Sequence, residues 1–172
     1  MPIYDLDNIE YLENDLDTLL DRLSAIYDIK FRKEKIEITP KLSDTSKTFW
    51  ASEENTVEFN KHIPDYKNLL REMYAFIENI TVFKLKKYEY SIFEAVYPNF
   101  KEFRFFNNKL KHQEKKSTEI SFTKIVFLDQ NLFDLCCNFK YPDKLEVVMF
   151  SEFVIIFLTI IKNFNVIEIT EN

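Results

Sequence analysis

The stretch LEVVMFSEFVIIFLTII, residues 145–161, decides which kind of fold the sequence predicts. It runs for 17 residues between Lys144 and Lys162 and includes Glu146 and Glu152. A bilayer-spanning helix needs about 20 mostly apolar residues and tolerates a central glutamate poorly. A helix that is apolar on nearly all sides is instead typical of a protein core. We therefore expect a central buried helix here and no membrane span, with a partly exposed groove for a partner as the remaining alternative.

The composition indicates one folded domain and excludes several catalytic motifs. Of the 172 residues, 46% are hydrophobic and 18 are phenylalanine, so the chain can bury a sizeable core. It contains no glycine. Glycine provides the left-handed backbone of phosphate-binding loops, dinucleotide-binding turns and nucleophile elbows. The sequence therefore predicts a single domain over residues 1–172 without these motifs.

Apolar residues recur at helical spacing over most of the chain. A capping box, Asp7 and Glu10, precedes the first pattern, and Pro64 is suited to the start of the second. Another capping box, Asp143 and Glu146, precedes the last pattern. The patterns predict helices over residues 8–28, 64–97 with a break near 81–84, 100–110, 122–139 and 143–161.

Two short segments have the composition of strands. The tetrapeptide IEIT occurs at residues 36–39 and at residues 167–170, with isoleucine alternating with polar residues. We expect a small sheet from Phe31 to Ile38 and from Val166 to Thr170, and a short strand in TVEF at residues 56–59. The predicted fold class is therefore mainly α: a compact single-domain helical bundle of about five or six helices with a small β element.

The cysteines and the N-terminal residues indicate a cellular compartment. Cys136 and Cys137 are adjacent, so they do not join distant segments, and an apolar pattern surrounds them. On a helix at most one of them would face the core, and buried inert thiols are expected. The first residues are acidic and lack the basic and apolar regions of a signal peptide. We therefore expect a cytoplasmic protein with reduced cysteines.

Charge is unevenly distributed, although the net charge is only −6. Residues 1–29 contain eight acids and one base. On the first predicted helix, Glu10, Glu13, Asp17 and Asp21 lie on the side away from the leucines. Such a surface is either simply solvated or attracts a basic protein partner, such as a toxin or nuclease, by electrostatic steering. These four acids are the predicted partner-binding residues.

A second charged region has the opposite sign. Residues 84–116 contain nine bases and four acids. The candidate nucleic-acid-binding residues are Lys101, Arg104, Lys109, Lys111 and His112. The basic side chains would contact phosphates and the interleaved phenylalanines would stack on nucleobases, with Arg104 and His112 acting in RNA cleavage. The phenylalanines also fit one buried helix face, so nucleic-acid binding or RNA cleavage is the alternative hypothesis.

Catalytic and metal sites have no recognisable pattern in this sequence. The two histidines, His62 and His112, lack neighbours at zinc-ligand spacing, and no nucleophile stands out beside a base. The sequence therefore predicts no metal, no cofactor and no enzymatic activity. A third hypothesis is an apolar ligand cavity lined by Phe150, Phe153 and Phe157.

The function predicted from these patterns is non-enzymatic protein binding. A small, acidic, aromatic-rich chain has the general character of an inhibitor, an immunity or antitoxin-type protein, or an accessory subunit. Such a protein would occlude its partner with the acidic face, while apolar anchors supply most of the affinity. The oligomeric state stays open.

Overall fold

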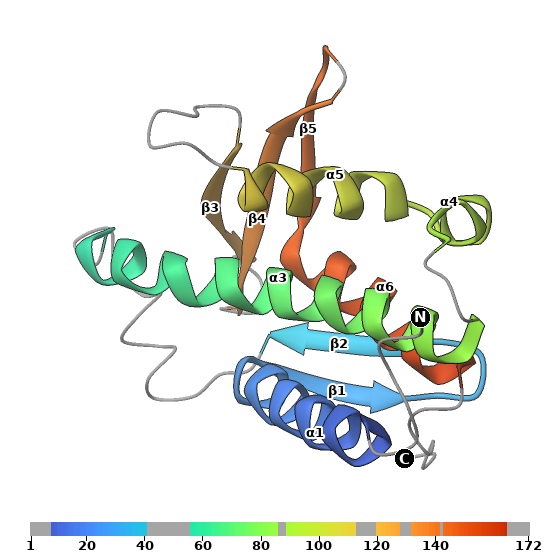
Figure 1. Cartoon of the computed structure of the whole chain (residues 1–172). Helices are drawn as coiled ribbons and strands as arrows, with labels where there is room; N and C mark the ends of the chain where they lie inside the picture. The colour runs from blue at the N-terminus through green and yellow to red at the C-terminus, as the bar shows by residue number, and fades with distance from the viewer. Residues whose placement is uncertain are drawn as a thin grey trace.

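The computed structural model describes residues 8–40, 56–85, 89–112, 120–127, 132–141 and 143–164 (Figure 1). The helices are α1 (Asn8–Ile26), α3 (Thr56–Leu85), α4 (Ser91–Val96), α5 (Phe100–Lys111) and α6 (Phe150–Asn163). The strands are β1 (Tyr27–Phe31), β2 (Ile36–Pro40), β3 (Ile120–Phe127), β4 (Leu132–Lys140) and β5 (Leu145–Met149). β1 and β2 form one antiparallel sheet, and β3, β4 and β5 form a second in that order. The predicted mainly helical bundle is therefore wrong, because the described residues form a mixed α/β fold.

The first sheet is a hairpin that follows α1 without a connecting loop. α1 ends at Ile26 and β1 begins at Tyr27, whereas the sequence predicts a helix to Asp28. β1 alternates buried or half-buried apolar residues with exposed charged ones, which is the period of a strand. It pairs with β2, in which Ile36 lies opposite Phe31. The strand predicted near residues 31–38 is thus part of this hairpin, and its predicted partner at residues 166–170 lies outside the described residues.

α3 begins earlier than the sequence pattern predicts. Residues 56–59 lie in its first turns and not in a strand, so Pro64 is inside the helix rather than at its start. Proline has no N–H to bond the carbonyl four residues earlier, so the helix bonding is interrupted there. The predicted apolar face is confirmed, because all of its members are buried: Tyr66, Leu69, Leu70, Met73, Ile77 and Ile80.

The residues predicted as a helix over 122–139 form two strands. β3 and β4 pair in antiparallel register, with Phe122 opposite Cys137. In β3, Ile120 and Phe122 are buried and the residue after each is exposed. β4 is covered on both faces from Asp134 to Cys137, so its sequence lacks the alternation of a half-exposed strand and a helical template also fits it.

The stretch at residues 145–161 divides into a strand and a helix. LEVVM is β5, which pairs with β4, and α6 begins only at Phe150. The helix start predicted at Asp143 is wrong, because a strand that contains the β-branched pair Val147 and Val148 follows it. The prediction of a buried helix is confirmed for the second part, where the buried residues are Phe150, Phe153, Val154, Ile156, Phe157, Leu158, Ile160 and Ile161.

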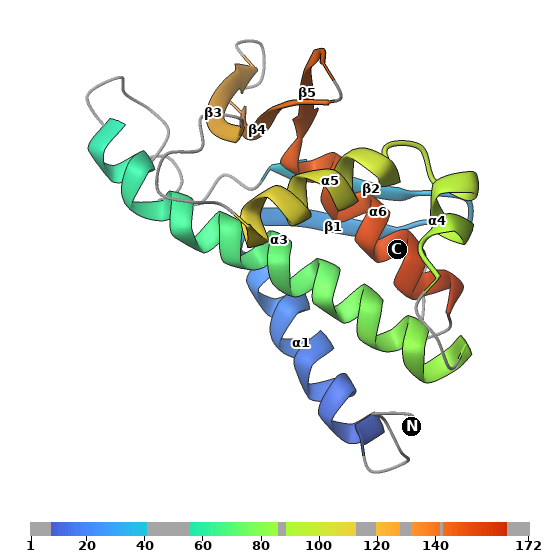
Figure 2. The ribbon, with the colours of Figure 1, turned by 45° about the horizontal axis from the view of Figure 1, so that its top comes forward.

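α6 is the centre of the core. It contacts α3, α5, β2, β4 and β5 and lies in the middle of the molecule (Figure 2). The ring centroid of Phe153 is 5.1 Å from that of Phe103 on α5, and Phe157 is 6.0 Å from Phe76 on α3. Each fully buried phenylalanine contributes about 1.5–3 kcal/mol through removal of apolar surface from water. Within the described ranges, no helix has both the length and the apolarity needed to cross a membrane.

Asn99 takes the backbone conformation that glycine usually adopts. It has φ 66°, the only positive value among the residues that the structure describes, and it lies between α4 and α5. Asparagine enters the left-handed region more readily than most residues other than glycine. The Asn99 side-chain amide also donates a hydrogen bond to the Glu152 carboxylate of α6 at 3.2 Å. A chain without glycine therefore still makes a sharp turn into α5.

Candidate functional site

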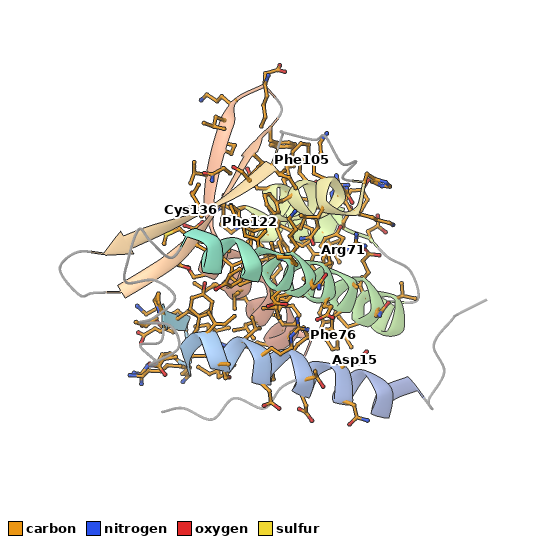
Figure 3. The ribbon with its side chains drawn as sticks, turned by 90° about the vertical axis from the view of Figure 1, so that its left-hand side faces the viewer. Asp15, Arg71, Phe76, Phe105, Phe122 and Cys136 are labelled. Carbon is orange, nitrogen blue, oxygen red and sulfur yellow. The ribbon has the colours of Figure 1, made fainter. Side chains whose placement is uncertain are left out.

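A groove lies between α1 and α3. Its volume is about 370 Å³. Figure 3 shows Asp15 on α1 and Phe76 on α3 close together where the two helices run side by side. Both helices contribute polar and apolar side chains, and the lining residues are Asp15, Thr18, Leu19, Arg22, Glu72, Ala75, Phe76 and Asn79.

The groove has an apolar floor that belongs to the core. Leu19 is 4% exposed and Phe76 is 3% exposed. The Phe76 ring makes an edge-to-face contact with Phe157 of α6, which holds it in place from below. Because this floor is packed against the central helix, the groove is part of the rigid framework rather than a gap between loosely joined elements.

The rim of the groove carries one negative charge in excess. Arg22 on α1 forms an ion pair with Glu72 on α3, so the charges of these two side chains cancel. Asp15 is half-buried, and the described residues provide it with no ion pair of its own. Burial raises the pKa of the Asp15 carboxyl, and the negative charge of Glu72 raises it further. A positively charged group in the groove would relieve this repulsion.

Two of the predicted acidic residues, Asp17 and Asp21, are not among the residues that line this groove. Asp17 and Asp21 are exposed on α1, on the side away from its buried leucines. Glu10 and Glu13 belong to the same helix, but their side chains lie outside the described part of the structure. The four acids therefore stay a predicted binding surface on α1.

Sequence reasoning missed the two acids that the structure places at the groove. Asp15 precedes Leu19 by four residues, and Glu72 precedes Phe76 by four. Residues four apart lie on the same helix face, so each acid is next to a core residue and not on the fully solvated side. This four-residue spacing is the feature of the sequence that could have identified the two acids. Only the packing of α1 on α3 shows that the two faces meet.

The basic stretch on α5 is partly committed to contacts within the protein. The Arg104 Nε donates a hydrogen bond to Glu94 Oε1 at 3.0 Å, and its guanidinium lies 3.9 Å from the centroid of the Tyr90 ring. The Lys109 Nζ lies 5.5 Å from the centroid of the Phe105 ring. These contacts orient Arg104 and Lys109 toward neighbouring side chains.

The rest of that stretch is exposed. Lys101, Lys111 and His112 are on the surface of α5 or at its C-terminal end. Lys111 lies near Glu78 of α3: burial raises the pKa of the Glu78 carboxyl, and the positive charges of Lys111 and Arg71 oppose that rise. Three of the four α5 phenylalanines that would stack on nucleobases are buried instead, and the fourth, Phe105, is half-buried: the buried three are Phe100, Phe103 and Phe106.

A buried polar cluster surrounds Asp134 of β4. The Tyr27 hydroxyl donates a hydrogen bond to Asp134 Oδ1 at 2.6 Å, and the Leu135 N–H donates to the same oxygen at 2.7 Å. The Ser151 hydroxyl at the start of α6 donates to Oδ2 at 2.6 Å. Burial raises the pKa of the Asp134 carboxyl, and the hydrogen bonds from Ser151, Tyr27 and Leu135 oppose that rise. This cluster joins β1, β4 and α6, and only 3% of Asp134 is exposed.

Both cysteines are buried beside this cluster. Cys136 and Cys137 are free thiols on opposite faces of β4, and both are buried because this strand is covered on both sides. Of the two, only Cys137 belongs to the hydrophobic core cluster, which agrees with the expectation that at most one faces the core. Burial raises the pKa of each thiol, and the charge of Asp134 raises it further. The expectation of buried thiols is confirmed, and the raised pKa values disfavour the nucleophilic thiolate.

The three residues predicted to line an apolar ligand cavity are packed in the core. Phe150, Phe153 and Phe157 are fully buried, and they line neither this groove nor the shallow hollow near residues 94–102. Their rings pack on other aromatic rings, among them Tyr66, which lies 5.5 Å from Phe150. In the described ranges, no group of three or more His, Cys, Asp and Glu side chains is arranged to hold a metal ion.

Comparison with known proteins adds no relative from which a function would transfer. No protein-family model matches the chain, and no curated protein or solved structure has significant similarity to it. The groove and the surfaces of the molecule are therefore the basis for inferring function.

Proposed function

We propose that the protein is a non-enzymatic binding module that receives a lysine or arginine side chain of a protein partner in the α1–α3 groove. The observation that carries this proposal is the Asp15 carboxylate, which has no ion pair among the described residues and lies beside Glu72 above an apolar floor. The general character of the chain is that of an inhibitor, an immunity or antitoxin-type protein, or an accessory subunit that acts by occluding its partner.

The groove suits both parts of a basic side chain. Lysine and arginine combine an aliphatic stem with a charged end. The stem would lie over Leu19 and Phe76, and the charged end would lie between Asp15 and Glu72. Because the floor is already ordered, binding requires little reorganisation of this protein, and the entropy cost falls mainly on the partner side chain.

The exposed acids of α1 add a long-range contribution. Asp17 and Asp21 lie outside the groove and do not need to touch the partner. Their field attracts a positively charged surface over about 10 Å at ordinary ionic strength and so raises the association rate. In this mechanism the groove determines the affinity, while the outer acids of α1 determine the rate of encounter.

The decisive experiment compares three tagged versions of the protein purified from its native cells. The wild type is compared with Asp15→Lys, which places a positive charge in the groove, and with Asp28→Lys, which makes the same change at an exposed position of β1. Bound proteins are quantified by mass spectrometry after nuclease treatment. We expect one stoichiometric partner, with at least about ten-fold less of it on Asp15→Lys, because a like charge in the groove opposes its cation.

The Asp28→Lys version controls for the change in net charge. Asp28→Lys should retain the partner at the wild-type level. Equal recovery on all three versions would show that the groove is not the binding site, and loss on both variants would show an effect of net charge alone.

Nucleic-acid binding is a second candidate because Lys101 and Lys111 are exposed on α5 and His112 is exposed at its C-terminal end. It predicts salt-sensitive binding to a mixed-sequence oligonucleotide. Fluorescence anisotropy of wild type and of the variant Lys101→Glu with Lys111→Glu tests it. Binding that the double substitution abolishes would favour this candidate over the groove.

A further inference from the structure

β5 is an edge strand with exposed apolar side chains. Among the described strands it pairs with β4 alone. Leu145 is 76% exposed and Val147 is 55% exposed, whereas Val148, which points to the other face, is 5% exposed. An exposed apolar edge strand is a template onto which another strand can add, and proteins usually block such edges with charge or cover them.

The backbone N–H and C=O groups of these two β5 residues have no partner among the described residues. The Tyr141 N–H donates to the Lys144 carbonyl oxygen at 2.8 Å, which makes these residues a hydrogen-bonded pair at the end of the hairpin. Hydrogen-bonded and non-hydrogen-bonded pairs alternate along antiparallel strands. Leu145 and Val147 are therefore at non-hydrogen-bonded positions with respect to β4, and their N–H and C=O groups point to the open edge.

Opposite charges flank the most exposed residue of this edge. Lys144 precedes Leu145, and Glu146 follows it. When a second β5 lies antiparallel with the two Leu145 residues opposite each other, Lys144 of each copy faces Glu146 of the other. A register centred on Glu146 would instead place two glutamates opposite each other, which is destabilising. Charge complementarity thus indicates a second copy of this strand and selects its register.

The position of the β4–β5 hairpin permits this pairing. The hairpin projects beyond α5 (Figure 1). Pairing centred on Leu145 brings the tips of two hairpins together, while the helices of the two copies stay apart. The contact is small compared with the roughly 1,000 Å² or more of a stable interface, so the dimer should be weak and concentration-dependent.

We propose that β5 is a self-association edge, through which two copies of this chain join their three-stranded sheets into one continuous antiparallel sheet. Leu145 lies at the two-fold axis, and two Lys144–Glu146 pairs flank it. The residues of this edge do not line the α1–α3 groove, so this inference is independent of the proposed function.

Sedimentation velocity of the full-length protein, from about 10 µM to about 1 mM, tests the inference. The wild type should show a reversible monomer–dimer equilibrium. Val147→Glu should remain monomeric over this range, because in the proposed register residue 147 faces Asp143 of the other copy, and like charges opposite each other destabilise a paired sheet. Val96→Glu is the matched control: Val96 is 67% exposed on α4, and its substitution should leave dimerisation unchanged.

A charge exchange tests the register itself. Lys144→Glu and Glu146→Lys should each weaken dimerisation at least about five-fold, and the two together should restore it, because the pairs form again with reversed sign. A wild type that is monomeric at all of these concentrations would overturn the inference. A strand from a different protein would then be the remaining candidate to pair with this edge. Dimerisation that is unchanged in Val147→Glu, or not restored by the double exchange, would also overturn it.

Discussion

Asp15 and Asp134 are two carboxylates whose pKa values are both raised, yet their surroundings differ. Asp134 accepts hydrogen bonds from Tyr27, Leu135 and Ser151 in a sealed cluster. Asp15 lines an open groove beside Glu72, whose charge adds to the effect of burial. A raised pKa alone therefore does not distinguish a carboxylate that stabilises the fold from one that is available to bind a partner.

The difference lies in how each carboxylate is compensated. Donors from three elements of the fold satisfy Asp134, so its removal should disturb the fold and not binding. Arg22, which lines the groove together with Asp15, is paired with Glu72, so the removal of Asp15 should disturb binding and not the fold. Four predictions test this contrast, from the largest expected effect to the smallest.

Tyr27→Phe should lower the free energy of unfolding by about 1.5–3 kcal/mol. The substitution keeps the buried ring but removes a hydrogen bond to a charged group, which leaves Asp134 less well compensated. Urea denaturation at neutral pH measures the loss. Tyr141→Phe is the control, since the ring contact between Tyr141 and Phe105 is retained, and its effect should stay within about 0.5 kcal/mol. A loss no larger than that of the control would show that the cluster does not hold β1 to β4.

Asp134→Asn should reveal the pH dependence that this carboxylate contributes. Its pKa is raised by burial above the usual 3.8, so the folded state binds the proton more tightly than the unfolded state does. The stability from this group is therefore full below pH 3.8 and is lost as the pH rises through the folded-state pKa.

Unfolding by urea at a series of pH values checks that sign. The free energy of unfolding of the wild type minus that of Asp134→Asn should fall as the pH rises above 3.8. Its slope should be no steeper than about 1.4 kcal/mol per pH unit. A difference that increases over this range would mean that the hydrogen bonds outweigh burial and lower the pKa instead.

Asp15→Asn should leave stability within about 0.5 kcal/mol of the wild type, because the side chain is half-buried and has no ion pair to lose among the described residues. Partner binding should nevertheless weaken by about five- to ten-fold, since the groove loses its excess charge. Urea denaturation and a titration with the captured partner measure the two effects. A large loss of stability with normal binding would reverse the assignment of roles between Asp15 and Asp134.

Asp17→Asn combined with Asp21→Asn should have the smallest effect. The association rate with the partner should fall by about two- to three-fold at low salt, with little change in the dissociation rate. At about 1 M salt the Debye length is only about 3 Å, so the difference from wild type should vanish. Stopped-flow measurements at both salt concentrations test this, and an effect that persists at high salt would place these acids in direct contact with the partner.

The helices that the sequence predicted best have a clear apolar stripe. Residues 100–110 were predicted as a helix and form most of α5, and the apolar face predicted for residues 64–80 is buried in α3. In both, apolar residues alternate with charged residues at helical spacing, so periodicity distinguishes a helix from a strand. The single domain over residues 1–172 stays a prediction.

The errors fall where that signal is missing. β4 is buried on both faces from Asp134 to Cys137 and lacks the alternation of a half-exposed strand, and β5 is followed directly by the apolar helix α6, so in both places a helical template also fits. Strand pairing between β3, β4 and β5 decides the outcome, and it depends on residues distant in the sequence. A local pattern does not contain that information.

The sequence by itself determined that this chain has a phenylalanine-rich core around residues 150–161, an acidic N-terminal helix, and no glycine-dependent motif. These properties follow from composition and from spacing within single elements. Only the tertiary structure decided that Asp15 and Glu72 meet in a groove, that Tyr27 reaches Asp134, and that Leu145 lies on an open edge. Each of these depends on contacts between distant segments, and such contacts form only when the elements pack.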